Sequence, residues 1–463
     1  STLASIWGWE LNNGIPILLA FFYFYYYIIA SVGKYCFALK KMNGQRSKRF
    51  RFIYVIGFIL VVLFVVSKFA DLEVRTHQLD SVIDKKQGIS ETQFLEKLRQ
   101  KQDNTLFLIG SHGGGLKANV WTLNVLNKIQ EQTKGKLLDQ TIAMSGASGG
   151  SLGLALYTGL YRAHGKDTDS IQMRINKLAK GNYTALDLTL TFGLDTYRKL
   201  WPLSSEMVLR DRPYYAMVRY QNYIDREQGK TLSQLSFRDY WKEAYEKKSS
   251  RDTTGYFPSL IMNTAATNGS RGILWSVAQK DFTNIFPFSQ NLADLPNDRT
   301  LPFYQAVSTT NRFPFLSPAA KIPGHGHYID AGAIDNSGLL SLLDLHNHLR
   351  RCDTTILANK QVAYIEIVNG KSPYTEFVLT NFKKEMGNPH IFIDEFETDN
   401  IIADLKTGFN LDKIPNYLSN FLSLWQKTEK GKIRYFRIFM PHKITVKDVE
   451  SYLNGEIMDP RTK

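Results

Sequence analysis

One serine, Ser148, lies in the stretch GASGG at 146–150, which fits the pattern G-x-S-x-G. The apolar run TIAMS at 141–145 precedes it, and a helix-like run at 150–163 follows it. In such a strand-to-helix turn the glycines remove side chains that would collide, and the serine hydroxyl projects above the sheet. The dipole of the following helix points at the same place. This spacing predicts that Ser148 is a nucleophile.

A second glycine-rich stretch, GSHGGGLKAN at 110–119, contains Gly113, Gly114 and Gly115. The backbone N–H groups of such a loop are suited to binding a tetrahedral oxyanion. The phosphate-loop patterns G-x-x-x-x-G-K-[ST] and G-x-G-x-x-G are both broken here. We therefore predict an oxyanion loop at 113–115.

A third stretch, GHYIDAGAIDNSG at 326–338, offers two carboxylates, Asp330 and Asp335. Asp330 follows a short apolar lead-in and precedes small residues, as a carboxylate at a strand end does. Asp335 lies in a more turn-like context. Taken alone, either aspartate is more often a turn residue than a catalytic one.

The three stretches can act together only in a fold that brings the ends of their strands to one place. The pattern of apolar residues in the rest of the sequence predicts such a fold. Apolar runs alternate with segments of helical periodicity, which favours an α/β fold with a mostly parallel sheet. The expected strands are 105–110, 141–145, 259–265 and 361–369, and the expected helices are 116–132, after the glycine-rich loop, and 150–163, after the serine motif.

In order and spacing, the three motifs resemble those of the patatin-like phospholipase family. The resemblance covers residues 104–370 and implies a three-layer fold, a Ser148–Asp330 dyad and an oxyanion hole at Gly113, Gly114 and Gly115. It implies no metal and no cofactor. Three positions depart from the family pattern: His112 stands where the family has Asp, Ala118 replaces its last glycine, and Ala331 follows the dyad aspartate. Lys117, at the start of the helix, is expected to contact an anionic headgroup.

The first 72 residues form a predicted membrane region. Residues 15–33 carry no charge, and 52–70 form a second apolar stretch interrupted only by Lys68, so we predict two transmembrane helices. The loop between them is basic, which is typical of a cytoplasmic loop, and this places the catalytic domain on the non-cytoplasmic side. The basic residues are Lys34, Lys40, Lys41, Arg46, Lys48, Arg49 and Arg51.

The other segments complete the predicted organisation. We expect a linker helix at 73–103, an aromatic-rich helical insertion at 165–255 within the catalytic domain, and a C-terminal extension at 371–463 packed on that domain. Residues 1–72 carry +6 of the net charge of +14 and the other 391 residues carry +8, so positive charge is densest near the N-terminus, which favours a membrane partner over nucleic acid. The two cysteines give no disulfide framework.

The predicted function is that of a membrane-anchored lipid acyl hydrolase acting on a phospholipid or another acyl ester lipid. Two alternatives stay open. One is a Ser-His-Asp esterase whose base is a late histidine such as His346, His390 or His442. The other is a membrane lipid sensor that keeps the fold without the activity.

Overall fold

The structure is a computed structural model. Apart from isolated helical positions between 55 and 65, it describes residues 14–41, 76–83, 88–181, 183–195, 211–224, 235–246, 258–314, 317–322, 324–370 and 413–440.

A large sheet forms the centre of the fold, in the order β1-β11-β12-β6-β5-β4-β13-β14. Five of its strands run parallel to one another. They are β4 (Thr105–Ser111), β5 (Thr141–Gly146), β6 (Ser259–Ala266), β13 (Gln361–Val368) and β14 (Ile433–Phe439). The middle strands are almost continuously buried, as expected for a parallel sheet covered on both faces. The predicted α/β fold with a mostly parallel sheet is confirmed.

Beyond β6 the sheet changes direction. Strand β12 (Gly326–Asp330) pairs antiparallel with β6, and β11 (Ala319–Ile322) pairs antiparallel with β12. Strand β7 (Arg271–Trp275) also pairs antiparallel with β6 and is followed by β9 (Ser289–Asn291). This antiparallel half carries Asp330 to the same part of the sheet as the parallel half carries Ser148.

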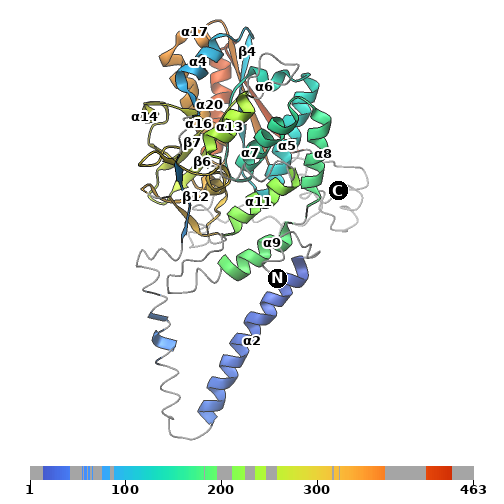
Figure 1. The fold of residues 1–463 in the computed structure, drawn as a ribbon, viewed down its shortest axis with the longest axis vertical. Helices are drawn as coiled ribbons and strands as arrows, with labels where there is room; N and C mark the ends of the chain where they lie inside the picture. The colour runs from blue at the N-terminus through green and yellow to red at the C-terminus, as the bar shows by residue number, and fades with distance from the viewer. Residues whose placement is uncertain are drawn as a thin grey trace, which may run out of the picture.

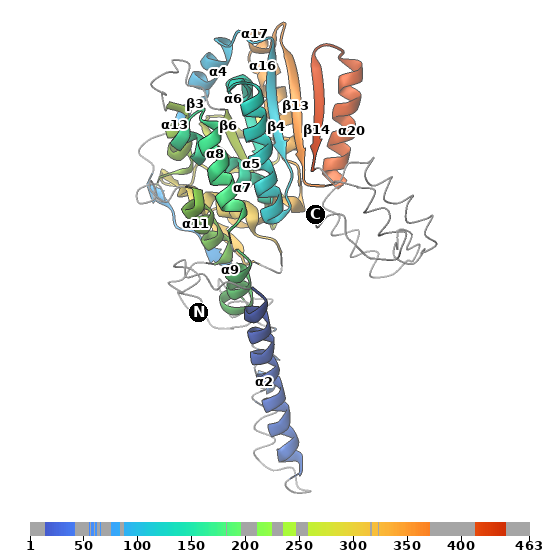
Figure 2. The ribbon, with the colours of Figure 1, turned by 90° about the vertical axis from the view of Figure 1, so that its right-hand side faces the viewer.

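Helices cover both faces of the sheet (Figures 1 and 2). On one face α5 (Gly115–Gln132) packs against α7 (Ser148–His164). On the other face α16 (Leu339–Cys352) contacts β4 and β5, and α20 (Lys413–Thr428) contacts β14 and α16. The buried apolar side chains of these layers belong to one continuous core.

The segment 73–103, predicted to be a linker helix, also contributes strands. Strand β1 (Thr76–Gln78) adds to the edge of the main sheet by pairing with β11, so this segment is part of the folded body. Helix α4 (Glu91–Arg99) begins at a capping box made by Ser90 and Gln93. The side chains of Phe94 and Leu98 on this helix are fully buried.

Between α7 and β6 the described residues are mainly helical, as the predicted insertion at 165–255 requires. Helices α8 (Thr168–Ala179) and α11 (Arg212–Ile224) pack on α5 and α7, and their buried side chains join the main core. The other elements are α9 (Thr184–Thr189), the π-helix η2 (Leu190–Asp195) and α13 (Phe237–Glu246).

Short elements complete the described part. Strand β2 (Val82–Ile83) pairs with β10 (Arg299–Thr300), and β3 (Ile89–Ser90) pairs with β8 (Val277–Ala278). The short helices are α6 (Lys136–Gln140), α14 (Phe282–Ile285), α15 (Phe303–Ser308), α17 (Thr354–Leu357) and the 3₁₀ turns η3 (Thr309–Asn311) and η4 (Ala331–Ala333).

An apolar helix, α2 (Gly14–Lys41), extends away from the folded body (Figure 2). Its segment Ile15–Lys34 is long and apolar enough to cross a membrane, and none of its most apolar window is buried. Among the described residues it is the single helix that meets these criteria. Most of the second predicted span, 52–70, lies outside the described residues. The prediction of two spans is thus supported for the first segment only.

Candidate active site

Ser148 is the first residue of α7 and directly follows the buried strand β5. Its φ of 45° lies in the left-handed region, which is strained for a residue other than glycine. The side chain is largely buried, and the backbone N–H donates a hydrogen bond to Thr310 Oγ1 at 3.0 Å. The strand-to-helix turn predicted from the pattern G-x-S-x-G is therefore present, and its serine is in a strained conformation.

Asp330 is the last residue of β12 and is only 4% exposed. Burial raises the pKa of its carboxyl to about 6, while hydrogen bonds from Gly332 and the Ser148 hydroxyl and the charge of Arg212 oppose the rise. Oδ1 accepts the Gly332 N–H at 2.8 Å. Among the described residues no hydrogen bond to Oδ2 meets full geometric criteria, so the Ser148 hydroxyl acts on the carboxyl from nearby without a well-formed bond, as is common in a site without substrate. The fold thus brings Ser148 and Asp330 together.

The segment 308–318 links both residues to the helical insertion. The backbone N–H of Asp330 donates to Arg312 O at 3.0 Å. The Arg312 side chain forms a fully buried ion pair with Asp211. The neighbouring Arg212, at the start of α11, donates to Ser317 Oγ at 2.6 Å. The insertion therefore holds the segment that positions the buried aspartate.

The predicted oxyanion loop leaves the sheet beside the serine turn, because Ser111 of β4 is in register with Gly146 of β5. The N–H of Gly113 is already engaged with Asn336 O at 2.9 Å. Gly114 and Gly115 are exposed, have positive φ angles of 143° and 63°, and lie at the start of α5. No acceptor for their N–H groups occurs in the part of the chain that the structure describes.

Close packing joins this loop to the serine turn. A Cβ on Gly113 would lie 3.0 Å from Ser148 Cβ, and a Cβ on Gly149 would collide with the carbonyl oxygen of Gly115. Both positions therefore require glycine. Lys117 lies in the first turn of α5 and is exposed, and its contact with a headgroup stays a prediction.

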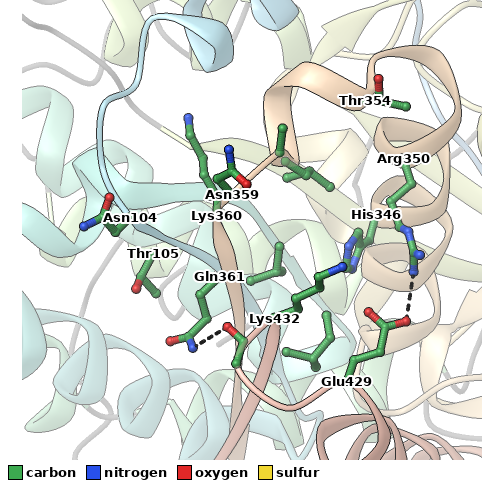
Figure 3. Close-up of a pocket in the computed structure, with 15 residues that line it drawn as sticks. Asn104, Thr105, His346, Arg350, Thr354, Asn359, Lys360, Gln361, Glu429 and Lys432 are labelled. Atoms are coloured by element: carbon green, nitrogen blue, oxygen red, sulfur yellow. Dashed lines mark hydrogen bonds and ion pairs between the residues drawn. The ribbon is translucent and has the colours of Figure 1, made fainter.

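Of the three histidines named for the alternative triad, the one that the structure describes lies away from Ser148. His346 is buried on α16, its Nδ1 is 2.6 Å from the Tyr364 hydroxyl, and burial lowers its pKa to about 4. It lines a cavity of about 810 Å³ with the first residues of β4, β13 and β14 (Figure 3). Ser148 follows the opposite, carboxyl end of β5, so the two sites are separated by a strand length, roughly 20 Å.

This cavity does not bear on the serine chemistry, because ligands of open α/β sheets bind at the carboxyl ends of the strands. His390 and His442 lie outside the described residues. No group of three or more metal-ligating side chains occurs among the residues that were placed.

Sequence reasoning missed three residues that act on the pair or its loop: Thr310 bonds to the Ser148 N–H, the charge of Arg212 acts on Asp330, and Asn336 O accepts the Gly113 N–H. Thr310 and Arg212 lie far from Ser148 and Asp330 along the chain, so local spacing gave no signal for their contacts. Asn336 lies in the DNSG stretch already noted for Asp335, where its carbonyl rather than its side chain engages Gly113. One signal for Thr310 was available in the sequence. Thr310 lies in the polar cluster STTN at 308–311, which comes shortly before an apolar loop.

No protein-family model matches the chain, and no curated protein matches it in sequence. Similar solved structures include VipD from Legionella pneumophila, with 12% identity, a TM-score of 0.30, and coverage of 82% of this chain and 69% of VipD. They also include human GIVD cytosolic phospholipase A2 in complex with methyl gamma-linolenyl fluorophosphonate, with 17% identity, a TM-score of 0.25 and coverage of 40% of this chain. The matched region spans 25% of that phospholipase chain. We interpret the site from its own geometry.

Proposed function

We propose that this protein is a serine hydrolase of acyl ester lipids, of the patatin-like type, that uses a Ser148–Asp330 dyad. The observation that carries the proposal is a serine in a strained turn at a helix start, close to a buried aspartate whose carboxyl pKa is raised by burial. A base with a pKa near the working pH is effective in proton transfer, and burial gives Asp330 that property.

In the proposed reaction Asp330 accepts the proton of the Ser148 hydroxyl while Oγ attacks the ester carbonyl carbon. The N–H groups of Gly114 and Gly115 bind the oxyanion, and Gly113, whose N–H is engaged, holds the loop in place. The tetrahedral intermediate collapses to an acyl-serine, and the leaving alcohol takes the proton from Asp330. Water then gives a proton to Asp330 and attacks the acyl carbon; the fatty acid leaves, and Asp330 returns the proton to Ser148 Oγ, which restores the hydroxyl and the carboxylate.

Lys117 is the residue we assign to an anionic headgroup. It is exposed in the first turn of α5, two residues after Gly115. A phosphate next to the scissile ester would therefore meet a cation. Lys117→Ala is expected to raise KM for an anionic phospholipid several-fold, with little change for an uncharged acyl ester.

The test of the proposal is hydrolysis of phospholipid vesicles by the purified full chain and by Ser148→Ala. Ser151→Ala is the matched control, because Ser151 is buried one turn further along the same helix. We expect Ser148→Ala to abolish release of fatty acid and Ser151→Ala to retain it. Equal activity of Ser148→Ala and the wild type would contradict the proposal.

The same assay separates the alternatives. Loss of turnover in His346→Ala, His390→Ala or His442→Ala to the level of Ser148→Ala, together with an active Asp330→Asn, would favour a histidine triad. A folded wild type that binds lipid but never releases fatty acid would favour the sensor.

We further propose that α2 anchors the protein in a bilayer that supplies its substrate, with a second span at 52–70. The exposed apolar side chains of α2 favour contact with lipid, and its Phe21 and Phe22 pack against Phe192 of the insertion. The basic loop between the spans favours a non-cytoplasmic catalytic domain.

Cys352 gives a test of this orientation, because it is exposed and Cys36 is the only other cysteine. In intact cells making the Cys36→Ser variant, a membrane-impermeant maleimide should label Cys352. Labelling only after lysis would indicate that the catalytic domain faces the cytoplasm. Recovery of the protein in the soluble fraction, without membranes, would contradict anchoring.

A further inference from the structure

Strand β13 carries a buried charge that the proposed reaction does not use. Glu366 lies within the apolar run VAYIEIV at 362–368, and its side chain is completely buried. A carboxylate in such a strand is costly unless polar groups surround it. The strand therefore contains a charged group that must be held by specific partners.

Glu366 has four such partners from three elements. His112 Nε2 lies 2.5 Å from Oε1, and Ser419 Oγ of α20 donates to the same oxygen at 3.2 Å. The Tyr435 hydroxyl of β14 donates to Oε2, and Arg437 Nε lies 2.9 Å from Oε2. These interactions outweigh burial and lower the pKa of Glu366, so the carboxylate is charged.

His112 is the residue directly before Gly113. Its backbone N–H donates to Ile367 O at 3.0 Å, next to Glu366 on the same strand. Asn369 Nδ2 reaches Gly113 O at 3.4 Å. The end of β13 therefore holds the base of the loop by a backbone bond at His112 and by side chains at Glu366 and Asn369.

We infer that Glu366, acting through the His112 side chain, is a positioning residue for the oxyanion loop, and that β14 and α20 serve to hold this carboxylate. The inference rests on the proposed function. It gives the C-terminal part of the chain a role in the reaction without any contact with substrate. Loss of the His112–Glu366 contact frees the loop, so the Gly114 and Gly115 donors leave the place where the oxyanion forms.

The test compares His112→Gln with His112→Ala. Glutamine keeps an N–H donor near the position of Nε2 and cannot act as a general base at neutral pH. We expect His112→Ala to lower kcat by about 10- to 100-fold with KM within about twofold, because a displaced donor weakens transition-state binding. His112→Gln should retain kcat to within about fivefold. The acylation rate with a fluorophosphonate should follow the same order.

Two further variants complete the design. Tyr435→Phe removes a donor to Glu366 without touching the loop, and we expect it to lower kcat by a smaller factor than His112→Ala. His346→Gln is the control, a buried histidine near the amino-terminal ends of the strands, and it should leave kcat unchanged. All rates are measured well below the lowest melting temperature of the set, so that every variant is folded.

Several results would overturn the inference. Unchanged kcat in His112→Ala would do so, as would an equal loss in His112→Gln and His112→Ala. A loss in His112→Ala as complete as that in Ser148→Ala, with an active Asp330→Asn, would make His112 the base. A wild type without Ser148-dependent turnover would refute the proposed function itself, which the wild-type assay shows before any variant is compared.

Discussion

The backbone N–H of Ser148 and the side-chain hydroxyl of Thr310 are joined by a hydrogen bond of 3.0 Å. Two residues after Thr310, the carbonyl of Arg312 accepts the backbone N–H of Asp330. One short segment thus fixes the backbone of both members of the proposed dyad, although the two are far apart in sequence. Their relative position depends on this segment as much as on the sheet.

Thr310→Val tests this link because valine keeps the shape and removes the acceptor. It leaves the Ser148 N–H without a partner in a buried turn, which costs about 1–3 kcal/mol. We expect a lower melting temperature and a fall in kcat of about tenfold, with KM nearly unchanged. The neighbouring Thr309→Val removes a hydroxyl that bonds to Ala306 O and should leave kcat unchanged. Equal effects of the two variants would contradict the link.

The pH dependence of activity follows from the raised pKa of Asp330. The aspartate accepts a proton in its ionised form, so kcat/KM should fall as pH falls through about 6, toward a tenfold loss per pH unit. The charge of Arg212 lowers this pKa, so Arg212→Gln should move the midpoint to higher pH. Arg219→Gln on the same helix is the control. A midpoint near 4, or no shift in Arg212→Gln, would contradict the assignment.

Asp330→Asn should abolish turnover and yet stabilise the fold at neutral pH. The folded pKa lies above the ordinary value of 3.8, so the ionisation of this carboxyl lowers stability as pH rises from about 4, and its full cost is present above about pH 6. Two pKa units correspond to at most about 3 kcal/mol. Urea unfolding should show this gain at pH 7.5 and its disappearance below pH 4, where the wild type is protonated in both states. If Asp330→Asn were less stable than the wild type at pH 7.5, the prediction that the buried charge destabilises the fold would be wrong.

Gly149→Ala tests the packing of the two glycine stretches. The added Cβ meets the carbonyl oxygen of Gly115 and must displace either the loop or the start of α7. We expect a loss of kcat of about 100-fold, similar to the loss of an oxyanion donor. Gly165→Ala, where a Cβ meets nothing within 4 Å but φ is 61°, reports the effect of backbone strain at the far end of α7. Full activity of Gly149→Ala would contradict the proposed geometry.

Local pattern was sufficient to predict β4, β5, β6 and β13, because each is an apolar run between turn residues. It also placed Ser148 in a strand-to-helix turn, whereas local pattern did not decide between Asp330 and Asp335, and the family resemblance favoured Asp330. The antiparallel half of the sheet was not predicted, because β1, β11 and β12 are short and their pairing depends on contacts between distant segments.

The contacts that support the site could not be predicted from local sequence pattern either, because their partners are far apart along the chain. His112 and Glu366 are separated by 254 residues, and Ser148 and Thr310 by 162. A partial signal did exist for Glu366, since one carboxylate within an apolar strand requires a buried partner. The sequence alone does not identify this partner; the fold places His112 next to Glu366.

The most direct test of the central claim is covalent labelling of the full chain by an alkyl fluorophosphonate, with the modified residue identified by mass spectrometry. The account predicts one adduct on Ser148, absent in Ser148→Ala, unchanged in Ser151→Ala and at least 100-fold slower to form in Asp330→Asn. An adduct on another residue, or a wild type that hydrolyses lipid without any adduct on Ser148, would contradict it.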